Sequence, residues 1–452
     1  MRRTTATRRA AFLALPLLSL IVAIGLPACG NGEEAGNGDG GTGTAASPTV
    51  VEFASIWVNP PRKPALEKVI EEFETVHPDI RIDTEFIQPD AYKMAIRTKV
   101  AAGEAPDVFF VWPGEWLWKF ARGGQVMDLT EELDEDGWGD RFLPNSMPLF
   151  EYEGGTYGVP MLMQCKYFFY NQQMFEDRDL AEPATWDELI HVCETFAGEG
   201  TTPIALSNAQ AWPLHHYATI LWQRLVGEDQ LLRDYDRVTG GDFSHPGYRQ
   251  GLEMLEELIS QGYFTPDANG VDRDSARLLF ASDESAMFYT GTWDLGWFQD
   301  ESLTPAEFID NWWMFQFPSV PGGEGNQSYM MGAPDGYAIA ADTDVPEAAL
   351  TWLRYFTSPD VSKQLVDELQ ELVCVEGAVT DQNAGPRLQK YANDLSSAPG
   401  VTPWADIMLE SSVREAFLDA LQGMLDGTVS PEGVLQRLRE AHAKAREEAA
   451  QE

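Results

Sequence analysis

The chain has 452 residues, of which 44% are hydrophobic and 23% charged, and it contains 14 Trp and 23 Phe. This composition excludes a wholly disordered chain, and the length exceeds what one core normally supports, so we expect two domains. Lys and Arg number 31 against 72 Asp and Glu, a net charge of −41, and because phosphate backbones repel such a polyanion we expect no nucleic-acid partner.

Residues 1–28 have the pattern of a bacterial lipoprotein signal peptide. A start with four arginines precedes an apolar run over 12–28, which is marginal for spanning a membrane. Leu26, Ala28 and Cys29 at its end resemble a lipobox, which implies cleavage before Cys29 and a lipid on its thiol. Ordinary signal cleavage with an unmodified Cys29 is the alternative.

Residues 29–49 are Gly-rich and almost free of apolar side chains, which predicts a flexible tether. With a lipid on Cys29, this tether would hold the folded part at the extracellular face of the cell membrane. Three further cysteines, Cys165, Cys193 and Cys374, have no CxxC spacing. At most one disulfide can form among them, the pairing stays open, and we expect a structural role for all three.

From residue 50 the hydrophobic pattern alternates between strands and helices. Strands are predicted at 51–57, 80–86 and 107–112, and helices at 64–76, 90–103 and 114–123. This alternation indicates a parallel sheet covered by helices on both faces, so the predicted fold class is α/β.

The pattern continues through the rest of the chain. An extended aromatic segment covers 158–171, and a capping box at Thr185 and Glu188 opens the next helix. The remaining predicted elements are strands at 203–206 and 285–289 and helices at 185–196, 252–259, 346–356, 359–369, 413–425 and 434–445.

Motifs of known catalytic and metal sites are missing. The sequence has no GxSxG, no HExxH, no GxGxxG opening a helix and no Walker loop. Among six His, only His215 and His216 are neighbours, and we expect adjacent residues on a helix to point apart. We therefore expect neither a metal site nor a cofactor.

Polar and aromatic side chains follow the first three predicted strands. In open α/β sheets, ligands bind beyond the carboxyl ends of the strands. An indole packs on the CH face of a sugar ring, and a neighbouring amide or carboxylate accepts hydroxyl hydrogen bonds, so these positions predict a sugar site; half-buried packing of the Trp residues is the alternative. The predicted contacts are Trp57, Asn59, Gln88, Asp90, Trp112 and Glu115.

Short motifs from residue 50 to the C-terminus together resemble one family. They lie at 102–108, 123–129, 157–160, 183–189, 286–293 and 332–339. They are similar to those of bacterial extracellular solute-binding proteins, the sugar-binding family that includes the maltose-binding proteins of ABC importers.

The resemblance implies two α/β lobes around a cleft that closes on its ligand. Lobe 1 would comprise 50–157 and 333–376, and lobe 2 would comprise 160–330 and 380–452. The implied function is capture of a sugar or oligosaccharide and its delivery to ABC permease subunits in the membrane. The chain would be a monomer without catalytic residues.

The resemblance also implies individual ligand contacts. Gln164 stands where maltose binders carry Glu, and Ala209 where they carry a ligand-facing Tyr, so the identity and chain length of the sugar stay open. Five other indoles, those of Trp116, Trp118, Trp297, Trp312 and Trp313, are expected in the core. The implied contacts are Trp112, Glu115, Gln164, Trp212, Trp293 and Trp404.

Two alternatives stay open. Asp90 and Glu115 beside Trp side chains would also suit a cationic solute such as a polyamine, through cation–π contact. A secreted carbohydrate-active hydrolase is the other alternative, because 72 acidic residues supply many possible carboxylate pairs.

Overall fold

The computed structural model describes residues 47–451. The predicted signal peptide, the lipid on Cys29 and nearly all of the predicted tether lie outside the described residues. No helix within 47–451 combines the length and the apolar character that crossing a membrane requires.

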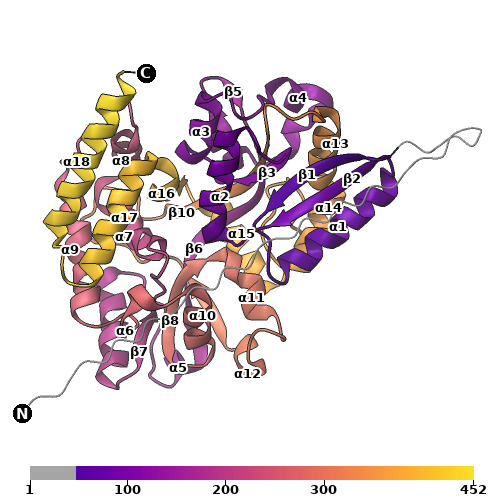
Figure 1. Ribbon diagram of the computed structural model, residues 1–452. Helices are drawn as coiled ribbons and strands as arrows, with labels where there is room; N and C mark the ends of the chain where they lie inside the picture. The colour runs from indigo at the N-terminus through magenta and orange to yellow at the C-terminus, as the bar shows by residue number, and fades with distance from the viewer. Residues whose placement is uncertain (1–46, 452) are drawn as a thin grey trace, which may run out of the picture. The chain divides into compact units, whose positions relative to one another are not determined.

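The first half of the sheet is a parallel βαβαβ unit. Strand β1 (Thr49–Ser55) lies between β2 (Ile80–Phe86) and β3 (Val108–Val111), and both pairings are parallel. Helices α1 (Arg62–Val76) and α2 (Pro89–Ala102) make the connections (Figure 1). The predicted order of strands and helices in this region is confirmed.

Two long strands join the halves of the sheet. β6 (Val159–Asn171) has thirteen residues, all buried. Its first part pairs antiparallel with β10 (Met330–Ile339) and its second part with β8 (Ser285–Gly291). The strand order is β2-β1-β3-β10-β6-β8-β7, so the sheet is parallel at its ends and antiparallel in the middle. The strands not yet bounded are β4 (Glu151–Tyr152), β5 (Gly155–Thr156), β7 (Thr202–Ala205), β9 (Trp312–Phe315) and β11 (Val401–Thr402).

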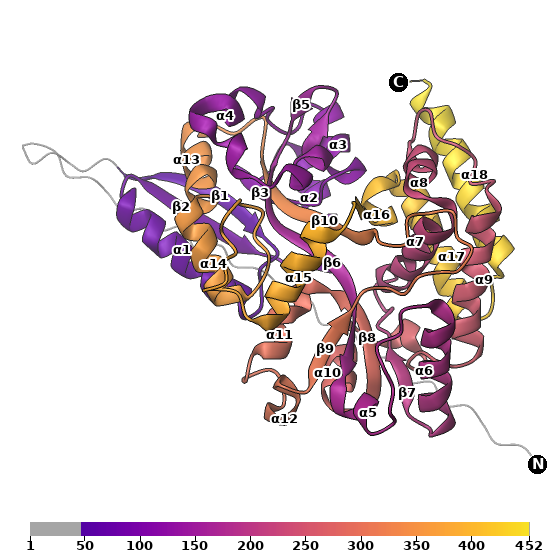
Figure 2. The same ribbon diagram turned by 180° about the vertical axis from the view of Figure 1, so that it is seen from behind.

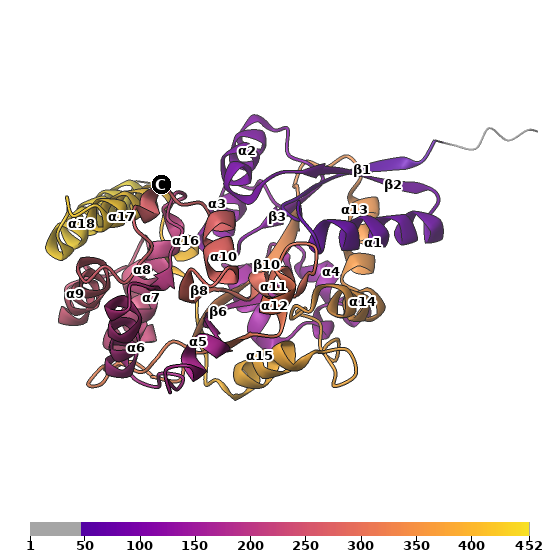
Figure 3. The ribbon, with the colours of Figure 1, turned by 90° about the horizontal axis from the view of Figure 1, so that it is seen from below.

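Long helices cover both halves. α13 (Pro346–Phe356) and α14 (Pro359–Leu369) pack against α1 beside β1 and β2 (Figure 1). From behind, α15 (Pro386–Ser397) runs across β6 (Figure 2), where Tyr391 Oη donates to Met163 O over 3.0 Å. In the other half, α17 (Ser411–Leu425) lies beside α18 (Pro431–Ala449), as Figure 3 shows.

Several helices were not predicted from the sequence. In α7 (Trp212–Val226), every residue after Trp212 is buried, so the helix has no polar face to create a 3.6-residue period. α10 (Arg273–Ala281) has nine residues, too few for a clear periodic signal. Besides α15, the other helices that were not predicted are α4 (Thr130–Asp134), α5 (Gln172–Glu176), α8 (Glu228–Tyr235), α11 (Leu295–Gln299), α12 (Ala306–Ile309) and α16 (Ala405–Met408). The predicted helices whose bounds are still to be given are α3 (Glu115–Arg122), α6 (Trp186–Gly198) and α9 (Pro246–Ser260).

Two hydrophobic clusters hold the described residues together. In one, Phe53 of β1 packs edge-on against Trp352, whose ring stacks on Phe356 at 5.0 Å. In the other, Trp222 stacks on Phe417 at 5.0 Å. The thiols of the three cysteines after Cys29 are free and buried within these clusters. Burial raises the pKa of each of these thiols, so they are unreactive and act as packing groups.

Candidate functional site

One pocket, partly open to solvent, is lined by side chains from both halves of the sheet. One side comes from the loop after β1, the start of α2 and the residue after β3. The other side comes from α7, α10, α11, α16 and the 3₁₀ turn at Thr292–Asp294. Elements more than 300 residues apart in sequence therefore meet at one cavity, as expected for a ligand site at the ends of sheet strands.

Most of the predicted ligand contacts are brought together here. The indoles of Trp57 and Trp112 and the polar side chains of Asn59 and Asp90 come from the first half of the chain. The pocket is lined by seven of the ten predicted contacts: Trp57, Asn59, Asp90, Trp112, Trp212, Trp293 and Trp404.

Two predicted contacts at strand ends do not line the pocket. Glu115 is 5% exposed, and its carboxylate accepts hydrogen bonds from Arg122 of the same helix, one of them 3.0 Å long. The two residues lie seven positions apart on α3 and hence on one helix face, so the carboxylate is occupied within the helix. Gln88 is exposed at the N-cap of α2.

Gln164 is the third predicted contact that does not line the pocket. It is 1% exposed on β6. Its Nε2 donates to Glu371 over 3.1 Å, and its Oε1 accepts from Thr292 over 3.0 Å. Because Glu371 does line the pocket, Gln164 holds a lining residue in place from behind.

Four rings form an aromatic wall, which consists of Trp212, Trp293, Trp404 and His216. The ring centroids of Trp293 lie 6.0 Å from those of Trp212 and 5.9 Å from those of Trp404, both in edge-to-face contact. His216 lies 5.2 Å from Trp404. Such contacts fix the orientation of each ring, so the wall is ordered before a ligand enters.

Lys166 of β6 lies buried beneath this wall. Its Nζ is 5.2 Å from the Trp293 ring and 5.9 Å from the Trp212 ring, and it donates to Tyr289 O over 3.2 Å. Burial lowers the pKa of the Lys166 ammonium to about 7.

Trp297, which was expected in the core, packs against the first hydrophobic cluster but also reaches the pocket. Its half-buried indole lines the pocket, with the guanidinium of Arg277 5.4 Å from the ring centroid. It lies one helical turn after Trp293, so the two indoles share one face of this segment. The other four indoles expected in the core do not line the pocket.

Charged residues that the sequence did not indicate complete one end of the pocket. Arg62 Nε donates to Glu371 over 2.7 Å. Burial opposes the charge on Arg62, but the Glu371 carboxylate raises the pKa of this guanidinium. Nearby Asp335 of β10 is also buried; burial raises its pKa to about 7, and Arg62 only partly offsets that effect.

A second cationic group comes from α10. Arg277 donates to Asp294 over 2.9 Å. Burial alone would raise the pKa of Asp294, but Arg277 and Arg273 lower it. Burial and Arg277 lower the pKa of Arg273, and Asp294, Asp274 and Asp90 partly offset this effect. Among the described residues that line the pocket, Arg273, Asn59 and Asp90 form no ion pair or side-chain hydrogen bond. These three side chains have free hydrogen-bonding groups at the pocket.

Sequence patterns contain only weak indications of these charged pocket residues. Arg62 follows the same strand end as Trp57 and Asn59 and could have been included by the same reasoning. Arg273 and Arg277 lie on a helix that the pattern did not predict. Asp335 and Glu371 carry no local motif, since only the tertiary fold brings them to the pocket.

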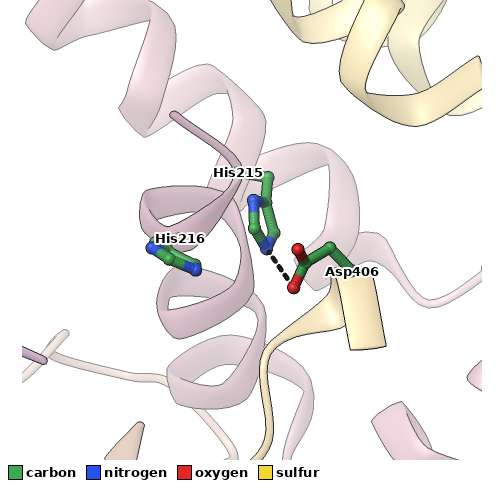
Figure 4. Close-up of side chains that lie close together, drawn as sticks. All are labelled: His215, His216 and Asp406. Atoms are coloured by element: carbon green, nitrogen blue, oxygen red, sulfur yellow. Dashed lines mark ion pairs between the residues drawn. The ribbon is translucent and has the colours of Figure 1, made fainter. Parts of the chain in front are cut away.

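His215 and His216 lie together, contrary to the expectation that they point apart. Their ring centroids are 4.2 Å apart, and His215 Nε2 lies 3.4 Å from Asp406 Oδ1 (Figure 4). Asp406 also lies 3.3 Å from Lys93 Nζ. Burial alone would raise the pKa of Asp406, but Lys93 and His215 hold it well below its ordinary value.

Comparison with known proteins agrees with this geometry. The sequence model of the family described as "Bacterial extracellular solute-binding protein" matches residues 59–363. The multiple sugar-binding protein of Streptococcus mutans is 24% identical over 329 residues, which are 71% of this chain and 74% of that protein.

Solved structures share the fold. A chitin oligosaccharide binding protein superposes with a TM-score of 0.82 at 22% identity, over 88% of this chain and 99% of that chain. A protein from work on xylan utilization by the thermophilic bacterium Caldanaerobius polysaccharolyticus superposes with a TM-score of 0.81 at 24% identity. The superposition covers 86% of this chain and 99% of that chain. These likenesses confirm the predicted two-lobed α/β fold.

Proposed function

Because the chain belongs to the bacterial extracellular solute-binding protein family, we propose that it captures a sugar or oligosaccharide in the pocket described above and delivers it to an ABC permease. Family membership confirms the expectation of solute binding rather than catalysis. The names of its relatives, a multiple sugar-binding protein and a chitin oligosaccharide binding protein, support a saccharide as the solute.

One observation carries the choice of a sugar: six of the 14 Trp side chains line one pocket that also has free polar groups. Indoles offer flat apolar faces for the CH groups of a sugar ring. Asn59 and Asp90 can accept hydrogen bonds from sugar hydroxyls, and Arg273 can donate them.

We also propose the boundaries of two lobes and a lipid anchor on Cys29. Lobe 1 would comprise 50–157 and 333–376, and lobe 2 would comprise 160–330 and 380–452. The pocket contacts of Trp112 and of Trp212 would then come from different lobes, so a bound ligand would favour the closed state. After cleavage of the signal peptide, a lipid on Cys29 and the tether at 29–49 would keep this monomer near its permease.

The charges of the pocket disfavour a cationic solute. Four cations, those of Arg62, Lys93, Arg273 and Arg277, line it together with four carboxylates. Free Arg273 would repel a polyamine, and burial keeps Asp335 protonated up to a pH of about 7.

Thermal-shift screening of the chain from residue 47 tests the proposal. The panel contains malto-, xylo- and chito-oligosaccharides, monosaccharides, spermidine and putrescine. We expect at least one saccharide to raise the melting temperature and both polyamines to have no effect. A response to polyamines alone would contradict the ligand class, and release of shorter sugars during prolonged incubation would indicate the hydrolase instead.

A further inference from the structure

Three buried side chains beside the pocket converge on one point. His215 and His216 lie near the start of α7, and Asp406 lies on α16. One ligand atom from each residue lies within 4.8 Å of the other two, as Figure 4 illustrates. His216 and Asp406 line the pocket, and His215, which is fully buried, lies next to both.

Each of these side chains has a buried polar atom without a hydrogen-bond partner among the described residues. The atoms are His215 Nε2, His216 Nδ1 and Asp406 Oδ1. Buried polar atoms in folded proteins are normally satisfied. His215 Nε2 and Asp406 Oδ1 face each other at 3.4 Å, so either a proton or a metal cation between them would satisfy both atoms.

The outer contacts of His215 and Asp406 are those of metal ligands. His215 Nδ1 contacts the carbonyl of Trp212, which can only accept, so Nδ1 carries a proton; once Nε2 has lost its own proton, its lone pair faces Asp406. Lys93 Nζ lies 3.3 Å from Asp406 Oδ2, and Asp406 Oδ1 faces His215 Nε2 instead. Metal-binding His and carboxylate side chains are oriented by contacts of this kind.

The separation of the two lone-pair atoms fits a tetrahedral ion. With metal–ligand bonds of about 2.0–2.1 Å, two ligands of tetrahedral zinc lie about 3.3 Å apart. His215 Nε2 and Asp406 Oδ1 are 3.4 Å apart, and a ring nitrogen of His216 is the third candidate ligand, within the 4.8 Å spread of the group.

We propose that His215, His216 and Asp406 bind a divalent transition-metal ion of the zinc type, with the fourth position open to the pocket. Two imidazoles and one carboxylate are a ligand set that suits zinc. The nearby Lys93 ammonium weakens the attraction for a cation, so we expect weaker binding than at a closed four-ligand structural site. This site goes beyond the proposed function, because it needs no sugar.

Titration with ZnCl₂ alone tests the proposal. The protein is purified without a polyhistidine tag, treated with EDTA and studied by calorimetry in the absence of sugar. We expect one ion per chain and at least a 100-fold weaker affinity in His216→Gln and in Asp406→Asn. His245→Gln is the matched control, because His245 Nε2 also lies 3.5 Å from a carboxylate, that of Glu324, but belongs to no group of three candidate ligands among the described residues.

Cobalt(II) gives a readout that does not depend on a variant folding. In the wild-type protein we expect the intense visible bands of a four-coordinate ion, which zinc displaces, without the near-ultraviolet band that thiolate ligands would give. Absence of zinc binding in the wild-type protein, or equal binding in all three variants, would overturn the proposal. A proton on His215 Nε2 would then pair this atom with Asp406, and water would satisfy His216 Nδ1.

Discussion

At the scale of single residues, Lys166 contacts the aromatic rings of the pocket and also affects the stability of the fold. It is 4% exposed, and its Nζ lies 4.9 Å from the Tyr289 ring in addition to its contacts with Trp212 and Trp293. Three rings favour its charged form, whereas burial disfavours it. Lys166 therefore orients the rings of the aromatic wall, and its burial lowers the free energy of unfolding by an amount that depends on pH.

Replacing Lys166 by Met should remove a pH-dependent part of the stability. The pKa of Lys166 is about 7 in the folded state against an ordinary 10.5. Between these values the unfolded state binds more protons, so the free energy of unfolding of the wild-type protein rises as pH increases from 7 to 10.5. The rise from this group is on the order of 4–5 kcal/mol, and Lys166→Met should lack it.

Urea unfolding of both proteins at pH 7 and pH 10 measures this difference. The quantity to compare is the free energy of unfolding of the wild-type protein minus that of the variant, because the other groups titrate equally in both proteins. An unchanged difference between the two pH values would show that Lys166 keeps an ordinary pKa in the folded state.

At the scale of secondary-structure elements, the contact between α3 and α16 depends on one glycine. Gly114 precedes α3 with φ 75° and ψ −152°, a region that only glycine adopts without strain. A Cβ atom there would lie 2.9 Å from the carbonyl oxygen of Ile407 and 2.9 Å from Met408 Sδ. Ile407 lines the pocket, so this close approach sets one of its walls.

Gly114→Ala should lower the free energy of unfolding by about 1–3 kcal/mol and also weaken ligand binding, because α16 must move away. Gly124→Ala is the matched control: Gly124 has φ +63°, but a Cβ there meets nothing within 4 Å. The control should lose about 1–2 kcal/mol of stability and keep its affinity. Equal affinities of the two variants would refute the role of the α3–α16 contact.

The elements also show what sequence patterns can and cannot predict. Amphipathic helices such as α1 and strands such as β2 were predicted because one face is more buried than the other. α7 was missed because burial on all sides erases that contrast. Likewise, Trp57 and Asp90 were found by their place after strands, whereas Asp335 and Glu371 reach the pocket only through long-range pairing.

At the scale of the whole described fold, three ion pairs connect α2 and α3 with the segment of α16 and α17. Lys93 pairs with Asp406 at 3.3 Å, Lys119 with Glu410 at 3.3 Å and Arg97 with Glu415 at 3.8 Å. In each pair the cation lies on α2 or α3. If lobes 1 and 2 separate on opening, these pairs break, so we expect them to favour the closed state.

Lys119→Glu should therefore weaken ligand binding about two- to fivefold, because an exposed pair contributes up to about 1 kcal/mol. The affinity of the wild-type protein should fall between 0.1 and 1 M NaCl, and that of the variant should fall less. Lys444→Glu, which breaks the Lys444–Glu448 pair within α18 at 3.6 Å, is the control. A loss of affinity as large in the control as in Lys119→Glu would rule out a specific effect on closure.

The central claim is that the indoles of this pocket hold a saccharide. Calorimetric titration with the saccharide that stabilises the protein most tests it directly, using wild type, Trp293→Ala and Trp313→Ala. The account predicts a Kd of about 1 µM or lower for wild type, about −8 kcal/mol, at least tenfold weaker binding by Trp293→Ala and an unchanged Kd for Trp313→Ala, whose indole does not line the pocket. Equal binding by Trp293→Ala and wild type, or no heat with any saccharide, would contradict it.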